Sequence, residues 1–144
     1  MVDVLTVDDQ AIFREVARAV IDATPGFEAA GEAASGAEAL EMVTSTQVRL
    51  ALVDVRMPGM DGIETARRLR AVEPPIVVVL ISLEDSADLP SSASACGAVA
   101  LVRKQDFGPN LLRELWAVYG DWDVPGRTRP VSAGGGGDAA TDLM

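Results

Sequence analysis

Short apolar runs of this sequence end on polar side chains that could do chemistry together. The polar residues are Asp8, Asp9, Asp54, Ser82 and Lys104. The apolar run that ends on Asp54 is followed at once by Pro58 and Gly59, and a run bounded by turn residues indicates a strand buried on both faces. Because the carboxyl ends of parallel strands meet at one edge of a sheet, we expect these side chains to surround one crevice.

The three carboxylates of this set need a cation. Carboxylates about 5 Å apart repel one another by roughly 3 kcal/mol per pair at an effective dielectric constant of about 20. The chain contains no histidine and a single cysteine, Cys96, and an all-oxygen ligand set favours Mg²⁺ over zinc. A metal ion, an ammonium and a hydroxyl around one further carboxylate suit phosphoryl transfer. Asp54, which stands alone and central, is the expected acceptor, and the product is an acyl phosphate.

Each of these residues also has an ordinary structural interpretation. Asp8 and Asp9 precede a predicted helix and could cap it, and Asp54 could serve only in a turn. Ser82 and Lys104, taken alone, would be solvated. Their shared position at strand ends makes the combined site the better hypothesis.

Alternating strands and helices are predicted to position these side chains. We expect strands over residues 2–7, 27–33, 48–53, 76–81 and 98–102. We expect helices over residues 10–23 and 109–119, two helices that begin with the capping pairs Ser35 with Glu38 and Asp61 with Glu64, and a short helix with Pro90 in its first turn. This alternation indicates an α/β fold with a five-stranded parallel sheet and helices on both faces. Right-handed crossovers and one reversal of winding direction leave few topologies, and the doubly wound, flavodoxin-like order 2-1-3-4-5, one of the two common orders, is the one that we expect.

The C-terminal part of the chain carries two further predictions. The helix over residues 109–119 has two apolar stripes, and we expect the one with Leu112 and Trp116 to contact a downstream protein partner or a second copy of the chain. Residues 121–144 are rich in Gly, Pro, Asp and Ser, so we expect a flexible tail after a folded domain of residues 1–120.

Composition bears on the class of protein. The formal net charge is −10, which repels phosphate backbones, so we expect no direct DNA binding by this chain. The longest apolar run, residues 76–81, is too short to cross a bilayer, and no charged-then-apolar leader opens the sequence. Together with the lone cysteine, these features predict a cytoplasmic protein without membrane contact.

Four motifs make the chain resemble the receiver domain of two-component response regulators. They are Val-Asp8-Asp9, Leu-Val-Asp54-Val-Arg-Met-Pro-Gly-Met-Asp-Gly62, Leu80-Ile-Ser82 and Val102-Arg-Lys104. The resemblance extends from residue 2 to about residue 119, and Asp54 four residues before Pro58 is its most specific part. The stretch Gly31-Glu-Ala-Ala-Ser-Gly-Ala-Glu-Ala-Leu40 resembles the subfamily usually attached to a helix-turn-helix domain.

The resemblance implies a phosphorylation site with a magnesium ion. Asp54 would take a phosphoryl group from a partner histidine kinase. Asp9 and Asp54 would ligate Mg²⁺ directly, together with the backbone carbonyl of Arg56. Asp8 would act through a bound water.

The resemblance further implies that Lys104 and the Ser82 hydroxyl hold the phosphoryl oxygens. The sequence departs from the family at Leu101, where an aromatic residue is usual, and at Pro90, which disturbs a helix of the signalling face. Leu83 is also bulkier than the usual residue after the hydroxyl and would narrow access to the acceptor. We therefore expect the chain to keep the phosphoryl chemistry of the family and to differ from it in the conformational change that signals to a partner.

The favoured hypothesis is a single-domain response regulator that signals through protein contact and is not an enzyme beyond self-catalysed phosphotransfer and dephosphorylation. After Tyr119 the sequence lacks the basic patch and helical periodicity of a helix-turn-helix domain. One alternative is a receiver-like module that binds partners constitutively. Another is a Mg²⁺-dependent phosphohydrolase, although such enzymes usually place a second acid two residues after the nucleophile, where this chain has Arg56.

Overall fold

A five-stranded parallel sheet forms the centre of the protein. The computed structural model describes residues 1–85 and 88–120. The strands are β1 (Val2–Val7), β2 (Phe27–Ala33), β3 (Leu50–Asp54), β4 (Val77–Ser82) and β5 (Ala100–Arg103). They lie in the order β2-β1-β3-β4-β5 and pair in parallel, so the predicted strand order is confirmed. The predicted tail, residues 121–144, lies outside the described residues.

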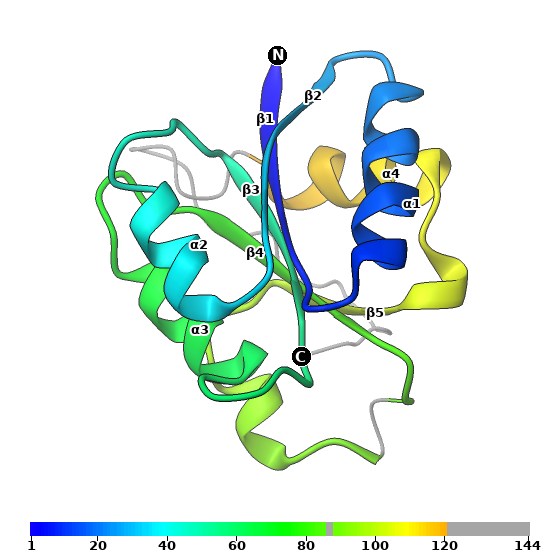
Figure 1. The fold of residues 1–144 in the computed structure, drawn as a ribbon. Helices are drawn as coiled ribbons and strands as arrows, with labels where there is room; N and C mark the ends of the chain where they lie inside the picture. The colour runs from blue at the N-terminus through cyan, green and yellow to red at the C-terminus, as the bar shows by residue number, and fades with distance from the viewer. Residues whose placement is uncertain (86–87, 121–144) are drawn as a thin grey trace.

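Helices cover both faces of this sheet. They are α1 (Ala11–Asp22), α2 (Gly36–Met42), α3 (Gly62–Arg70) and α4 (Pro109–Tyr119). Figure 1 shows α2 and α3 on one side of the sheet and α1 and α4 on the other, with β1 running downward from the N-terminus. Because the strands are parallel, all their carboxyl ends lie toward that lower edge. Within residues 1–85 and 88–120, no helix has the length and apolar character needed to cross a membrane.

The connection from β4 to β5 differs from the prediction. Among its described residues a short helix is present, as predicted, but it is the 3₁₀ helix η2 (Ser91–Ser94) rather than an α-helix, and the placement of Pro90 in its first turn is wrong. Pro90 precedes the first turn in an extended conformation with a ψ of 151°. A helix is stabilised mainly by burying an apolar face, and this Ser- and Ala-rich stretch buries only small side chains such as Ala93 and Cys96.

The apolar runs of β3 and β4 are buried along their whole length. Alternate residues of a strand point to opposite faces of the sheet. Val53 and Leu80 therefore lie in the core shared with α2 and α3, whereas Leu52 and Ile81 lie in the core shared with α1 and α4. A continuous apolar run is what a strand covered on both faces requires.

Both predicted helix caps are present. Ser35 Oγ accepts a hydrogen bond from the backbone N–H of Glu38 at 3.1 Å at the start of α2. Asp61 Oδ1 accepts one from the backbone N–H of Glu64 at 2.9 Å at the start of α3. These caps satisfy N–H groups that have no partner within the helix, and the second one defines where the loop after Asp54 ends.

The apolar stripes of α4 are used differently from the prediction. Leu112 is fully buried in the core under the sheet, so its assignment to a partner-binding surface is wrong. Trp116 is half-buried, with Phe27 edge-on at 6.5 Å and the Arg49 guanidinium 5.3 Å from its ring centre. The other stripe carries Val118, which is 50 % exposed. Both stripes are apolar, so the sequence pattern alone did not show which of them packs against the sheet.

Candidate functional site

The carboxyl ends of β1 and β3 bring three carboxylates together. Asp8, Asp9 and Asp54 each place a carboxylate oxygen within 4.8 Å of the others. Asp8 and Asp54 are buried, whereas Asp9 is exposed. Because Val7 pairs with Val53 in the sheet, the residues that follow them emerge side by side. The predicted acidic cluster is therefore formed by the fold.

Lys104 reaches the same cluster from the end of β5. It is the first residue of η3 (Lys104–Asp106), a 3₁₀ helix directly after that strand. Its Nζ lies 2.7 Å from Asp8 Oδ2 and 3.7 Å from Asp54 Oδ1, and its side chain is only 9 % exposed. The ammonium thus sits beside the two buried carboxylates and balances part of their charge.

Ser82 ends β4 at the same edge of the sheet. Asp54 pairs with Ile81 across β3 and β4, so Ser82 is the next residue beyond that pair. Its side chain is buried, and its Oγ accepts a hydrogen bond from the backbone N–H of Glu84 at 2.9 Å. A hydroxyl that accepts in this way keeps its own hydrogen for donation to another oxygen.

The electrostatics of the cluster favour a further positive charge. Burial, and next the negative charge of Asp8, raise the pKa of Asp54 from 3.8 to about 6, although Lys104 acts in the opposite direction. Asp8 Oδ2 is buried and has no hydrogen-bond partner among the described residues, because its close ion pair with Lys104 lacks hydrogen-bond geometry. A buried carboxylate oxygen in that state has capacity for a metal ion or for a metal-bound water.

The residues present fit Mg²⁺. The three clustered donors are all carboxylate oxygens, and this ion binds through one or two carboxylates while keeping several waters. The exposed carboxylate of Asp9 leaves one side of the cluster open to those waters. The unsatisfied oxygen of Asp8 is placed to accept from one of them.

Gly62 holds the backbone of the predicted acceptor. A Cβ at this position would lie 2.0 Å from the Asp54 carbonyl oxygen and 2.8 Å from the Cα of Val55. The backbone N–H of Gly62 also donates to the Val55 carbonyl at 2.9 Å. The glycine in the motif after Asp54 is therefore required for the close approach of α3 to the end of β3.

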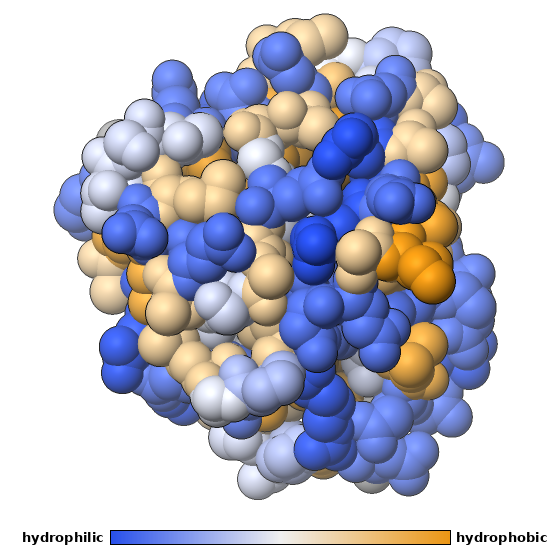
Figure 2. Space-filling view, in the orientation of Figure 1, coloured by the Kyte–Doolittle hydropathy of each residue, from blue (hydrophilic) through white to orange (hydrophobic). Residues whose placement is uncertain are grey.

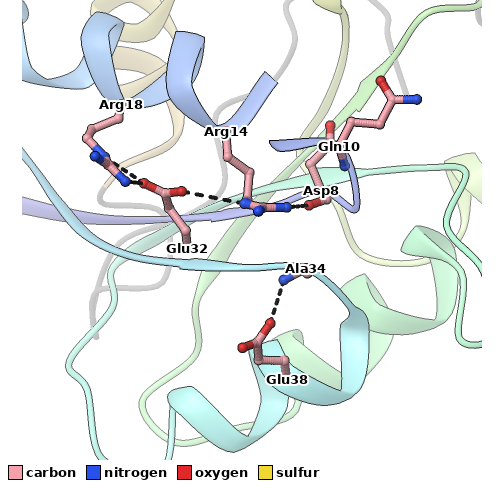
Figure 3. Close-up of polar contacts among 7 residues, drawn as sticks. All are labelled: Asp8, Gln10, Arg14, Arg18, Glu32, Ala34 and Glu38. Atoms are coloured by element: carbon pink, nitrogen blue, oxygen red, sulfur yellow. Dashed lines mark hydrogen bonds and ion pairs between the residues drawn. The ribbon is translucent and has the colours of Figure 1, made fainter. Parts of the chain in front are cut away.

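Arg14 is a site residue that the sequence did not indicate. From α1 its Nη1 donates to the Asp8 carbonyl oxygen at 2.7 Å, and its Nε lies 3.5 Å from the Glu32 carboxylate on β2. Figure 3 shows Arg14 between Asp8 and Glu32, with Arg18 on the far side of the same carboxylate. One arginine on an amphipathic helix has no local signal, because its partners come from two other strands. It ties the end of β1 to the edge strand.

Charged residues surround the mouth of the site. Arg56 pairs with Glu84 at 2.8 Å, and Arg103 pairs with Asp85 at 3.0 Å, so the loop after Ser82 is tethered on both sides. Leu83 is 68 % exposed, pointing to solvent rather than filling the crevice. Figure 2, in the orientation of Figure 1, shows hydrophilic residues in a band down the face that it views, with apolar residues in small patches beside them.

The family follows from a comparison with known proteins. A family model described as the response regulator receiver domain matches residues 4–116. The chain belongs to the response regulator receiver family. Receiver domains of this family act in two-component signalling, where they interact with histidine kinases and downstream effectors and bind Mg²⁺ at an acidic pocket.

Relatives of known name contain this receiver as one part of a longer chain. A protein-glutamate methylesterase/protein-glutamine glutaminase from Halalkalibacterium halodurans is 36 % identical over 104 residues, which are 72 % of this chain and 30 % of the relative. The Mycobacterium tuberculosis protein named "Probable transcriptional regulatory protein NarL" is 37 % identical over 114 residues, 79 % of this chain and 53 % of the relative. The chain thus spans about a third to a half of these relatives, and the similarity concerns their receiver part.

Solved structures show the same fold. The signal receiver domain of NarL from Mycobacterium tuberculosis has a TM-score of 0.70 at 32 % identity, covering 81 % of this chain and 94 % of that one. The response regulator domain of Thermotoga maritima CheB has a TM-score of 0.68 at 28 % identity, covering 81 % and 95 %. The receiver fold predicted from the motifs is confirmed.

Proposed function

We propose that residues 1–120 form a receiver domain that accepts a phosphoryl group on Asp54 from a sensor histidine kinase in a Mg²⁺-dependent reaction. The observation that supports this most is the place of Lys104, whose Nζ lies 3.7 Å from Asp54 Oδ1 inside a buried acidic cluster. Because the chain contains no histidine, the phosphohistidine donor belongs to the partner.

The proposed step joins one oxygen of Asp54 to phosphorus. A carboxylate oxygen of Asp54 attacks the phosphorus of the partner's phosphohistidine, the new P–O bond forms, and the P–N bond breaks as the imidazole leaves. The Lys104 ammonium binds one equatorial phosphoryl oxygen, and the Ser82 hydroxyl donates to another. Both groups are buried, so their charge and dipole act with little screening by water.

Three kinds of oxygen would hold the magnesium ion. Asp9 and Asp54 would ligate it through their carboxylates, and Arg56 through its backbone carbonyl. Asp8 would bind through a coordinated water, in agreement with its unsatisfied Oδ2. When bound, the ion supplies neutralisation of the phosphoryl charge.

The proposed output is contact with a downstream protein. The two ion pairs that tether the loop after Ser82, Arg56 with Glu84 and Arg103 with Asp85, are exposed, and exposed pairs contribute at most about 1 kcal/mol each. New bonds between the Ser82 hydroxyl and a phosphoryl group are strong enough to reorganise such a loop. DNA binding by this acidic chain is not part of the proposal, and its cytoplasmic location stays a prediction.

A second candidate is a receiver module that binds its partner regardless of phosphorylation. It is favoured by the short 3₁₀ helix η2, which the described residues form between β4 and β5, and by Leu101, an aliphatic residue that packs against the core beside Leu80. A partner affinity that does not change on phosphorylation of Asp54 would support it. The phosphohydrolase alternative has less support, because Arg56 stands where a second acid would be needed.

The experiment is phosphorylation by a small donor. The protein is incubated with acetyl phosphate and Mg²⁺, and covalent phosphate is measured by intact mass spectrometry. We expect one phosphoryl group on the wild type, none on Asp54→Asn, and normal labelling of Glu15→Gln, which removes an exposed carboxylate of α1 outside the cluster. Equal labelling of the wild type and Asp54→Asn would contradict the proposal. Continuous multiple-turnover release of phosphate from phosphomonoesters would favour the hydrolase instead.

A further inference from the structure

An aromatic ring lies against the ammonium of the site. Lys104 Nζ is 4.7 Å from the centre of the Phe13 ring, over its face. Phe13 belongs to the buried side of α1, together with Ala17 and Ile21. A buried phenylalanine at this spacing is ordinarily explained by core packing alone, and the contact with a site residue is additional.

A second ring supports the first. The rings of Phe13 and Phe107 are 6.1 Å apart between centres and tilted by 53°, a favourable aromatic arrangement. Phe107 directly follows η3, the 3₁₀ helix that begins with Lys104. The aromatic pair therefore joins α1 to the segment that carries the lysine, and it holds the Phe13 ring at a defined angle.

The environment makes this contact strong. The face of an aromatic ring attracts a cation, and the attraction is larger where water is excluded. The Lys104 side chain and Phe13 are both only 9 % exposed. A ring face is also a poor hydrogen-bond acceptor, so the N–H groups of the ammonium stay available for oxygen atoms. Those nearest are Asp8 Oδ2 at 2.7 Å and Asp54 Oδ1 at 3.7 Å.

We propose that Phe13 is a positioning residue for phosphoryl transfer, holding the Lys104 ammonium against its ring so that the ammonium stays beside the Asp54 carboxylate. This inference rests on the function proposed above. A lysine side chain is long and flexible, and its ammonium contributes most to a transition state when it is already in place. The ring limits the positions open to that ammonium without competing for its hydrogen bonds.

A spectroscopic experiment tests the contact itself. Lys104 is the only lysine in the sequence, so labelling with ¹³C-lysine produces a single set of side-chain signals. We expect the Hε signals to lie upfield of those of a solvated lysine because of the Phe13 ring current, and to return toward that value in Phe13→Leu. In Phe27→Leu, which alters the ring packed against Trp116, the shift should remain. Unshifted Hε signals in the wild type would overturn the inference.

A substitution series separates positioning from packing. Phenylalanine with one, two or three ring fluorines is incorporated at position 13, which weakens the attraction for a cation with little change in ring size. We expect phosphorylation of Asp54 by acetyl phosphate to slow progressively, by about 5- to 30-fold at three fluorines. The same series at Phe27 is the control and should leave the rate unchanged.

The outcomes distinguish this inference from the proposed function. A wild type that takes up no phosphate refutes the proposed function, and the positioning role falls with it. A wild type that is labelled normally, with a rate that does not depend on fluorination at Phe13, overturns the positioning role alone. Equal slowing by fluorination at Phe13 and Phe27 also overturns it, because it would reflect packing.

Discussion

Replacing Asp54 by asparagine is expected to stabilise the protein when no divalent cation is present. Burial of the carboxyl, and next the charge of Asp8, raise its pKa from 3.8 to about 6. A carboxyl with a raised pKa binds its proton more tightly in the folded state than in the unfolded chain. Its ionisation therefore destabilises the fold, fully above about pH 6 and not at all below about pH 4.

The size of the expected stabilisation follows from the shift in the pKa of Asp54. A change from 3.8 to about 6 corresponds to about 3 kcal/mol at about 1.36 kcal/mol per unit of pKa. Asparagine keeps the size of the side chain but loses the attraction to Lys104, so we expect a net gain of about 1–2 kcal/mol in the free energy of unfolding at pH 7. At pH 5 the two titration curves leave about half of that gain.

The assay is urea unfolding in a buffer with a chelator, at pH 5 and pH 7, for the wild type and Asp54→Asn. Glu15→Gln is the matched control, and its stability should stay within about 0.5 kcal/mol of the wild type at both pH values. Added Mg²⁺ should stabilise the folded wild type, because the ion binds only the folded site. It should stabilise Asp54→Asn less, because the variant lacks one of the proposed carboxylate ligands. An asparagine variant that is no more stable than the wild type at pH 7, or whose gain does not fall at pH 5, would refute the reasoning.

Four further substitutions test the contacts that hold the site and the packing of α4. Gly62→Ala should destabilise by more than about 3 kcal/mol in urea unfolding, because its Cβ would lie 2.0 Å from the Asp54 carbonyl oxygen. Arg14→Met should lower the free energy of unfolding by about 1–3 kcal/mol, because it removes the hydrogen bond from Arg14 to the Asp8 carbonyl oxygen after β1. It should also weaken Mg²⁺ binding measured by calorimetry. Leu112→Ala should cost about 2–5 kcal/mol in thermal unfolding, whereas Val118→Ala on the exposed stripe should cost less than about 0.5 kcal/mol.

The strands and the acidic cluster were predictable because their signals are local. The apolar runs of β3 and β4 are continuous, as a strand buried on both faces requires. Once the strand order is known, the residues after each carboxyl end must share one edge. The proximity of four site residues could therefore be predicted from the expected strand ends: Asp8, Asp9, Asp54 and Lys104.

The predictions were wrong where one local sequence pattern was compatible with more than one structure. Residues 109–119 carry two apolar stripes, and only the packing against the sheet decided that Leu112 is enclosed. The stretch before β5 has helix-forming alanines, but it lacks an apolar face large enough to support an α-helix. In both places the tertiary contacts decide the outcome, because short segments are only marginally stable by themselves.

The amino-acid sequence by itself determined the family, the α/β class and the residue types of the acidic cluster, since each depends on residue type and on spacing along the chain. Only the tertiary structure decided which groups surround that chemistry: Arg14 against the end of β1 and Phe13 against the Lys104 ammonium. The physical reason is that both contacts depend on how α1 packs against the sheet. Both contacts join α1 to separate strand ends, and side-chain contacts between such segments depend on helix rotation and packing, which no local pattern encodes.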